Sequence, residues 1–227
     1  MIEEIYRKIL HNEEDELTGD FFGTIKYIPF QEGLGKILIS NLENDKANII
    51  KKIDKPKYYF WNKDDNNNRK FRKAKDNTEP DLLIVDEKNR IVILIEVKYN
   101  SGPSDSEEIT QVEREANFLN ENFIKEDKYE TIFIYIAKDE LCNVIKQRYN
   151  KDKIIIISWS NILETINRIR NEEKNKEYIK EIFEDIGKLL EVKNFEQFKG
   201  FSNNIREVNK LYYEFEKEED KNERKCK

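Results

Sequence analysis

The fold is decided by two apolar stretches, Asp81-Leu-Leu-Ile-Val85 and Arg90-Ile-Val-Ile-Leu-Ile-Glu-Val97. Both consist largely of branched aliphatic residues, which favour strands. Only the polar residues Asp86-Glu-Lys-Asn89 separate them, so we expect a β-hairpin. The second stretch is apolar at nearly every position. This predicts a central strand that is covered on both faces.

The segments after the hairpin alternate between helical and strand-like patterns. The spacing of apolar residues predicts a helix over residues 106–125 and strands over 131–136 and 153–157. A short helix is expected over 139–149, between those two strands. Such alternation is typical of parallel crossover connections, so the predicted fold class is α/β.

The region before the hairpin is predicted to be mainly helical. Residues 2–28 carry one apolar stripe, with a break expected near His11 and an end at Pro29. A second helical region is expected over 34–53. The aromatic run at 58–61 is strand-like, and a polar loop over residues 63–77 follows it.

The chain after residue 160 reads as helix, with an amphipathic face over 172–191 and a last helix near 207–220. No linker composition or internal repeat divides the sequence. We therefore predict one domain, in which residues 1–160 form the core and residues 161–227 form a helical extension packed on it. The apolar stripe of the extension could also pair with a second copy of the chain or with a partner protein.

The scarce residue types exclude several classes of site. His11 is the one histidine among 227 residues, which excludes zinc and nuclease sites built from several imidazoles. The two cysteines cannot form a four-thiolate zinc site or a disulfide framework, so a reducing cytoplasm is expected. The seven glycines form neither common nucleotide-binding loop. No apolar run has the length of a membrane span, and the acidic beginning is unlike a signal peptide.

Three charged residues, Asp81, Glu96 and Lys98, are the candidates for a catalytic metal site. Glu96 and Lys98 are two positions apart on one strand, so their side chains point to the same face. The turn near residues 87–88 brings Asp81 to the same end of the hairpin. Two carboxylates can hold Mg²⁺, which polarises a phosphate and lowers the pKa of a bound water. Lys98 can orient that water and offset the charge of the transition state.

The main structural alternative is an internal salt bridge between Asp81 and Lys98. A Glu-x-Lys pair on a strand is common, as is an aspartate after a proline. Charges at the end of so apolar a strand nevertheless need a reason, because buried charges are costly unless they are paired or bound to metal.

The pattern Pro80-Asp81, fourteen intervening residues and Glu96-Val97-Lys98 resembles the PD-(D/E)XK nuclease superfamily, the fold of many restriction enzymes. The segment Glu14-Asp-Glu-Leu-Thr18 is similar to the first-helix motif of several bacterial groups in that superfamily. Gln111-Val-Glu-Arg-Glu115 is similar to the motif that related proteins carry on the helix after the lysine. The resemblance covers about residues 1–160 and leaves the extension unexplained.

The resemblance implies a mixed central β-sheet flanked by helices and Mg²⁺-dependent cleavage to 5′-phosphate and 3′-hydroxyl ends. It implies that Asp81, Glu96 and Glu14 face the metal, with the carbonyl of Val97 as a third ligand beside the first two. Glu13 is an alternative to Glu14. Lys98 is implied to position the nucleophile, and Gln111 is implied to point into the site. Mn²⁺ could substitute for Mg²⁺.

Other features bear on a nucleic-acid substrate. The net charge of −6 is unusual for a nuclease, but a local basic cluster can suffice as a backbone clamp. That cluster precedes Asp81 and contains Arg69, Lys70, Arg72, Lys73 and Lys75. Its alternative is a solvated loop. Tyr58 to Trp61 could stack bases, although packing of alternate residues in the core is favoured. Cys142 is expected to be a small buried residue.

The leading hypothesis is a metal-dependent nuclease in the cytoplasm that acts on DNA rather than RNA. The second is a catalytically silent module that keeps the nuclease fold and binds a partner. The third is a Mg²⁺ enzyme acting on another phosphate substrate, because the site chemistry does not name the substrate.

Overall fold

The computed structural model describes residues 13–72, 78–99, 105–125, 127–148, 154–172 and 176–195. The strands in these ranges form one sheet in the order β1-β2-β3-β4-β5. They are β1 (Lys57–Phe60), β2 (Leu82–Asp86), β3 (Ile91–Val97), β4 (Glu130–Ala137) and β5 (Ile155–Ser158). The β1–β2 and β2–β3 pairs are antiparallel, and the β3–β4 and β4–β5 pairs are parallel. The expected α/β class with a mixed, helix-flanked sheet is therefore confirmed.

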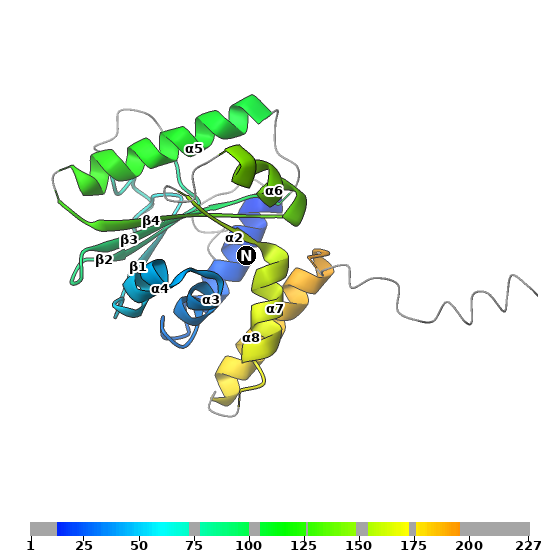
Figure 1. Ribbon diagram of the computed structural model, residues 1–227. Coiled ribbons are helices and arrows are strands. Elements are labelled where there is room, and N and C mark those ends of the chain that lie inside the picture. The colour runs from blue at the N-terminus through cyan, green and yellow to red at the C-terminus, as the bar shows by residue number, and fades with distance from the viewer. Residues whose placement is uncertain are drawn as a thin grey trace, which may run out of the picture. The chain divides into compact units, whose positions relative to one another are not determined.

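Helices cover both faces of this sheet (Figure 1). They are α2 (Glu13–Ile25), α3 (Leu34–Asn41), α4 (Asn44–Lys51), α5 (Asp105–Leu119), the π-helical turn η1 (Asn120–Ile124), α6 (Asp139–Arg148), α7 (Trp159–Ile169) and α8 (Glu177–Val192). The helical region expected over 34–53 is two helices, because the backbone is extended at Leu42 and Glu43. The break expected near His11 lies outside the described residues.

The predicted hairpin is confirmed. Leu82 pairs with Ile95 and Asp86 with Ile91, and all residues of β2 and β3 are buried. The Asp86 carboxylate closes the turn, since it accepts hydrogen bonds from the backbone N–H of Asn89 at 3.0 Å and from the Asn89 side chain at 2.8 Å. It also accepts the N–H of Asp54 at 2.9 Å. The turn is thereby tied to the chain just before β1.

The alternation of side chains along the strands produces two apolar cores. One core lies between the sheet and α5 and α6, and contains Val92, Leu94, Phe118 and Cys142. The other contains Ile93, Ile95 and residues of α2, α3, α7 and α8. Figure 1 shows the corresponding layers, with α5 along one face of the sheet and α2, α3, α7 and α8 on the other. The central strand β3 is covered on both faces, as its sequence predicts.

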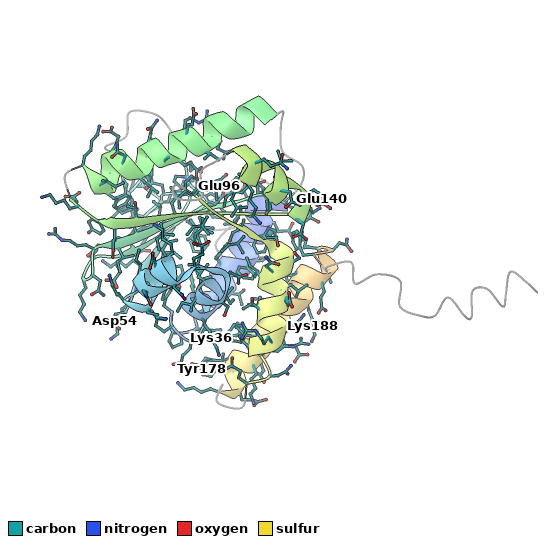
Figure 2. The ribbon with its side chains drawn as sticks, viewed as in Figure 1. Lys36, Asp54, Glu96, Glu140, Tyr178 and Lys188 are labelled. Carbon is teal, nitrogen blue, oxygen red and sulfur yellow. The ribbon has the colours of Figure 1, made fainter. Side chains whose placement is uncertain are left out.

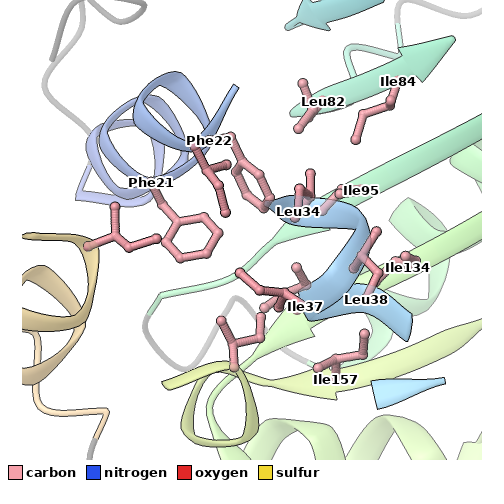
Figure 3. Close-up of a cluster of buried hydrophobic side chains, with 14 of the residues drawn as sticks. Phe21, Phe22, Leu34, Ile37, Leu38, Leu82, Ile84, Ile95, Ile134 and Ile157 are labelled. Carbon is pink, nitrogen blue, oxygen red and sulfur yellow. The ribbon is translucent and has the colours of Figure 1, made fainter. Parts of the chain in front are cut away.

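The larger core joins the helices of the N-terminal half to every strand. Figure 3 shows Phe21 and Phe22 of α2 beside Leu34, Ile37 and Leu38 of α3, opposite side chains from β2 to β5. Phe21 also packs edge-on against Trp159 of α7, with ring centroids 5.2 Å apart. These contacts fix the position of α2, whose first turn reaches the end of the sheet described below.

The helices α7 and α8 share this core. Ile162, Ile166, Ile179, Phe183 and Leu190 are all less than 2% exposed and belong to the same cluster as β3 and β4. The expected last helix near 207–220 lies outside the described residues. None of the helices in the described ranges is both long and apolar enough to cross a membrane.

Candidate metal centre

The hairpin register brings Asp81 next to Glu96, one step beyond the Leu82–Ile95 pair. The Asp81 carboxylate accepts the backbone N–H of Val97 at 2.8 Å. Glu96 and Lys98 lie on the same face as Asp81, and the three residues are 2%, 6% and 6% exposed, respectively. Sequence spacing therefore placed these three charges together correctly. Figure 2 labels Glu96 between the sheet and α5.

Glu14, in the first turn of α2, completes the group from the opposite side of the sheet edge. The Lys98 ammonium donates to Glu14 Oε1 at 3.0 Å and to Glu96 Oε1 at 2.8 Å. The ion pairs of Lys98 among the described residues are thus with the two glutamates, and the Asp81–Lys98 salt bridge considered above is not formed. The next residue of α2, Asp15, accepts the indole N–H of Trp61 at 3.2 Å, which fixes the rotation of the helix at Glu14.

The helix α5 contributes Gln111 from above the sheet. Its amide donates to Glu96 Oε1 at 2.5 Å, so the side chain points into the site as the resemblance implied. Glu96 Oε1 therefore accepts from both Lys98 and Gln111. Glu96 Oε2 is buried and has no hydrogen-bond donor among the described residues. One oxygen of this carboxylate is held in place while the other remains available.

Carboxylate oxygens of Glu14, Asp81 and Glu96 lie within 4.8 Å of one another, close enough to hold a metal ion. Neighbouring ligands of an octahedral Mg²⁺ lie about 3 Å apart and opposite ones about 4 Å, so small side-chain rotations would bring all three oxygens into range. An all-oxygen donor set with no sulfur or imidazole suits hard cations. Glu96 Oε2 is buried and accepts no hydrogen bond from the described residues, so it is available to bind such an ion.

Comparison with models of protein families, with curated proteins and with solved structures found no match for this chain.

The electrostatics of the site favour a cation. Burial, followed by the negative charge of Glu96, raises the pKa of Asp81 well above its usual value. Burial and the charge of Glu115 do the same to the pKa of Glu96. Burial acts to lower the pKa of Lys98, but Glu96, Asp81 and Glu14 outweigh it and raise that pKa above its usual value. The lysine is therefore a fixed ammonium group among carboxyls that repel one another.

Glu115 is a site residue that sequence reasoning missed. It is 1% exposed and lies one helical turn after Gln111 on α5. Burial raises the pKa of its carboxyl group to about 7, outweighing the nearby Glu96, Lys98 and Gln111, which act to lower that pKa. The signal that could have found it is the i, i+4 spacing from Gln111, which places both side chains on one face of the helix. Its neighbour Glu113 is exposed, so composition alone does not separate the two.

The backbone beneath Lys98 is anchored from two sides. The N–H of Lys98 donates to Ile136 O at 2.7 Å, which extends the β3–β4 ladder past Val97. The indole N–H of Trp159 donates to Lys98 O at 3.3 Å. Both tryptophans of the chain thus brace the site, Trp61 through α2 and Trp159 through the lysine backbone.

The described part of the predicted basic cluster forms a structured loop, residues 63–72, called here the basic loop. Asn62 holds its ends together, since its amide donates to Phe71 O and accepts the N–H of Phe71. Within it, the Arg69 guanidinium donates to Thr78 O at 3.3 Å. The loop begins beside the site because Trp61 N donates to Asp81 O at 3.0 Å. Lys73 and Lys75 lie outside the described residues.

The remaining sequence interpretations concern packing. Tyr59, Phe60 and Trp61 are buried, and Tyr59 belongs to the core on the opposite face from Phe60, so the core role of the aromatic run is confirmed. Cys142 is 1% exposed, as expected.

Proposed function

We propose that this protein is a metal-dependent nuclease of the PD-(D/E)XK type, with a restriction-endonuclease-like core. The observation that carries the proposal is the convergence of Glu14, Asp81 and Glu96 around Lys98 at one end of the sheet. Each of these residues comes from a different position in the chain and is held by a separate structural contact. A simple structural salt bridge would need only one acid for Lys98.

The three carboxylates would hold Mg²⁺, and Mn²⁺ would be accepted because it prefers the same oxygen ligands. When bound, such an ion supplies positive charge to a phosphate and makes a water more acidic. Asp81 is held by the Val97 N–H, and Glu96 is oriented through one oxygen by Lys98 and Gln111. These contacts prepare the donor atoms before the ion arrives.

Lys98 would act as a positioned cation. Its ammonium group already carries hydrogen bonds to Glu14 and Glu96, and its pKa lies above the usual value, so it stays protonated at neutral pH. A protonated lysine can donate to the attacking water or to a phosphate oxygen and offset the charge that develops there. It would not remove a proton from that water.

The substrate proposed is DNA in preference to RNA. The basic loop contains Lys63, Arg69, Lys70 and Arg72, and it begins two residues after Trp61, whose backbone N–H donates to Asp81 O. Cations near the metal centre can contact backbone phosphates, and such contacts give sequence-independent affinity. This carboxylate chemistry needs no histidine, which fits a chain that contains one.

The test is a titration with Mg²⁺ or Mn²⁺ against plasmid, linear and single-stranded DNA and RNA. Wild-type protein is compared with Lys98→Ala and with Lys88→Ala, which removes an exposed lysine from the turn of the same hairpin. We expect cleavage by the wild type and by Lys88→Ala, and loss of cleavage in Lys98→Ala. Absence of cleavage on every substrate, together with no metal binding by calorimetry, would favour the non-catalytic module instead.

A further inference from the structure

The helix α8 ends beside the catalytic end of the sheet, on the face opposite α5. Just after the helix, Phe195 stacks on Trp159 with centroids 5.4 Å apart and meets Tyr99 edge-on at 5.6 Å. Tyr99 directly follows Lys98, and Trp159 donates to the Lys98 carbonyl. The predicted extension therefore reaches the residues that position the catalytic lysine.

Two lysines converge on the Tyr99 ring. The Lys138 ammonium lies 4.7 Å from the ring centroid and the Lys193 ammonium lies 5.2 Å from it. Lys138 follows β4 and Lys193 follows α8, so segments far apart in the sequence bring two positive charges to one aromatic side chain. We call Tyr99, Lys138 and Lys193 the Tyr99 lip.

The lip is joined to the metal centre through α2. Glu16 forms an ion pair with Lys193 at 3.5 Å, and Glu14, two residues earlier, binds Lys98. The Lys193 side chain is 17% exposed and Glu16 is 44% exposed, so the pair can be reached from solvent.

The negative charge of the molecule favours a second group of cations near the site of a nuclease. The chain carries a net charge of −6, and Glu14, Asp81, Glu96 and Glu115 gather at the site itself. Phosphates would be repelled unless cations flank the carboxylates. The basic loop supplies cations on the Asp81 side, and the Tyr99 lip supplies them on the Lys98 side.

We propose that the Tyr99 lip binds the phosphodiester backbone of the nucleic-acid strand that enters the site, with Lys138 and Lys193 contacting phosphates. This inference rests on the proposed nuclease function and gives the C-terminal helix α8 a role in substrate binding. The aromatic ring holds both ammonium groups in place through cation–π contacts, so less side-chain freedom is lost when a phosphate binds. The recognised feature is the backbone phosphate, so little sequence preference is expected from this surface.

The experiment measures binding separately from cleavage. Fluorescence anisotropy with a short labelled DNA strand and its duplex, with Ca²⁺ in place of Mg²⁺, is compared among wild type, Lys138→Gln and Lys193→Gln. Each variant should weaken binding about three- to tenfold and lower the slope of log affinity against log salt by about 0.7 to 0.9. Lys193→Arg should restore both values, since it keeps the charge.

The matched control is Lys188→Gln, which removes an exposed charge from the same helix, α8, where Lys188 pairs with Glu184. It should bind like the wild type. Thermal unfolding of each variant, with rescue by Lys193→Arg, separates loss of a phosphate contact from loss of structure.

Wild-type affinity and salt slope in both Lys138→Gln and Lys193→Gln would overturn the lip, even if the protein cleaves DNA. Lip-dependent binding by a protein that cleaves nothing would keep the lip and overturn the nuclease. Absence of any binding to nucleic acid would overturn both.

Discussion

Two buried aspartates lie at the two ends of strand β2, and their pKa values are shifted in opposite directions. Asp81 precedes β2 and Asp86 ends it, and they are 6% and 2% exposed. Burial acts to raise the pKa of Asp86, but hydrogen bonds from Asn89 and from the N–H of Asp54 outweigh it and lower that pKa. At Asp81, burial and the charge of Glu96 raise the pKa, and Lys98 and the hydrogen bond from Val97 N–H do not offset them.

The contrast distinguishes an acid that stabilises the fold from one that is kept for a ligand. Asp86 has donors enough to be stable as a carboxylate, so its surroundings are complete. Asp81 lies beside Glu96 and Glu14, whose like charges Lys98 offsets only in part, and such an arrangement costs stability unless a further cation joins it. Raised carboxylate pKa values in a cluster with specific partners are a mark of functional sites.

The largest expected effect concerns activity. Asp81→Asn should lower kcat/KM for cleavage by about a thousandfold or more, because it removes a charged donor from the metal centre. The same change should leave the metal-free protein as stable as the wild type or more so, since the amide keeps an acceptor for Val97 N–H without the buried charge. Steady-state cleavage rates and chemical unfolding in EDTA measure the two effects. A variant that cleaves like the wild type would remove Asp81 from the site.

The pH dependence of stability should differ between the metal centre, which includes Glu115, and the hairpin turn at Asp86. The folded-state pKa of Glu115 is about 7, above the 4.5 of an unperturbed glutamate, so the folded state binds the proton more tightly. The stability contribution of this group is therefore full below pH about 4.5 and is lost as pH rises to about 7, by up to about 3 kcal/mol. Unfolding in EDTA across this range should show a shallower decline for Glu115→Gln. Parallel curves would contradict the raised pKa.

Asp86 should behave in the opposite way. Its lowered pKa means that its stabilisation is present above the unfolded pKa near 4 and is lost as pH falls through the folded value. Asp86→Ala should cost about 2 kcal/mol at neutral pH, because three partly buried hydrogen bonds to its carboxylate are lost. Glu87→Ala, an exposed change in the same turn, is the control. The kcat of the folded Asp86→Ala protein should stay near the wild-type value.

The smallest effect is stabilisation by the metal. At ten times its dissociation constant, a divalent cation adds about 1.4 kcal/mol to the stability of the folded state, which corresponds to a rise of about 3–5 °C in Tm. The rise should be present in Asp86→Ala and absent in Asp81→Asn, as measured by differential scanning fluorimetry. An equal rise in Asp81→Asn would place the cation elsewhere.

Much of this architecture was predictable from the sequence. The hairpin and the central strand follow from unbroken apolar runs at residues 82–85 and 91–95. The convergence of Asp81, Glu96 and Lys98 follows from strand alternation and the position of the turn. These features depend on local spacing, which a single sequence contains.

Contacts between distant segments were harder to predict. Glu14 and Gln111 were identified only through a family resemblance, because helix packing and not spacing brings them to Glu96 and Lys98. Glu115 lies within the charged run Glu113-Arg-Glu115, where only its burial in the folded structure distinguishes it from its two exposed neighbours. The contact of Lys193 with Tyr99 joins residues nearly a hundred positions apart, and nothing in the charged sequence around Lys193 indicates it.

The most direct test of the central claim is a calorimetric titration of the metal-free protein with Mn²⁺, using wild type, Asp81→Asn and Asp86→Asn. The two variants make the same chemical change at opposite ends of β2. We predict that the wild type and Asp86→Asn bind the ion and that Asp81→Asn does not. Equal binding by Asp81→Asn and the wild type would contradict a metal centre at Glu14, Asp81 and Glu96.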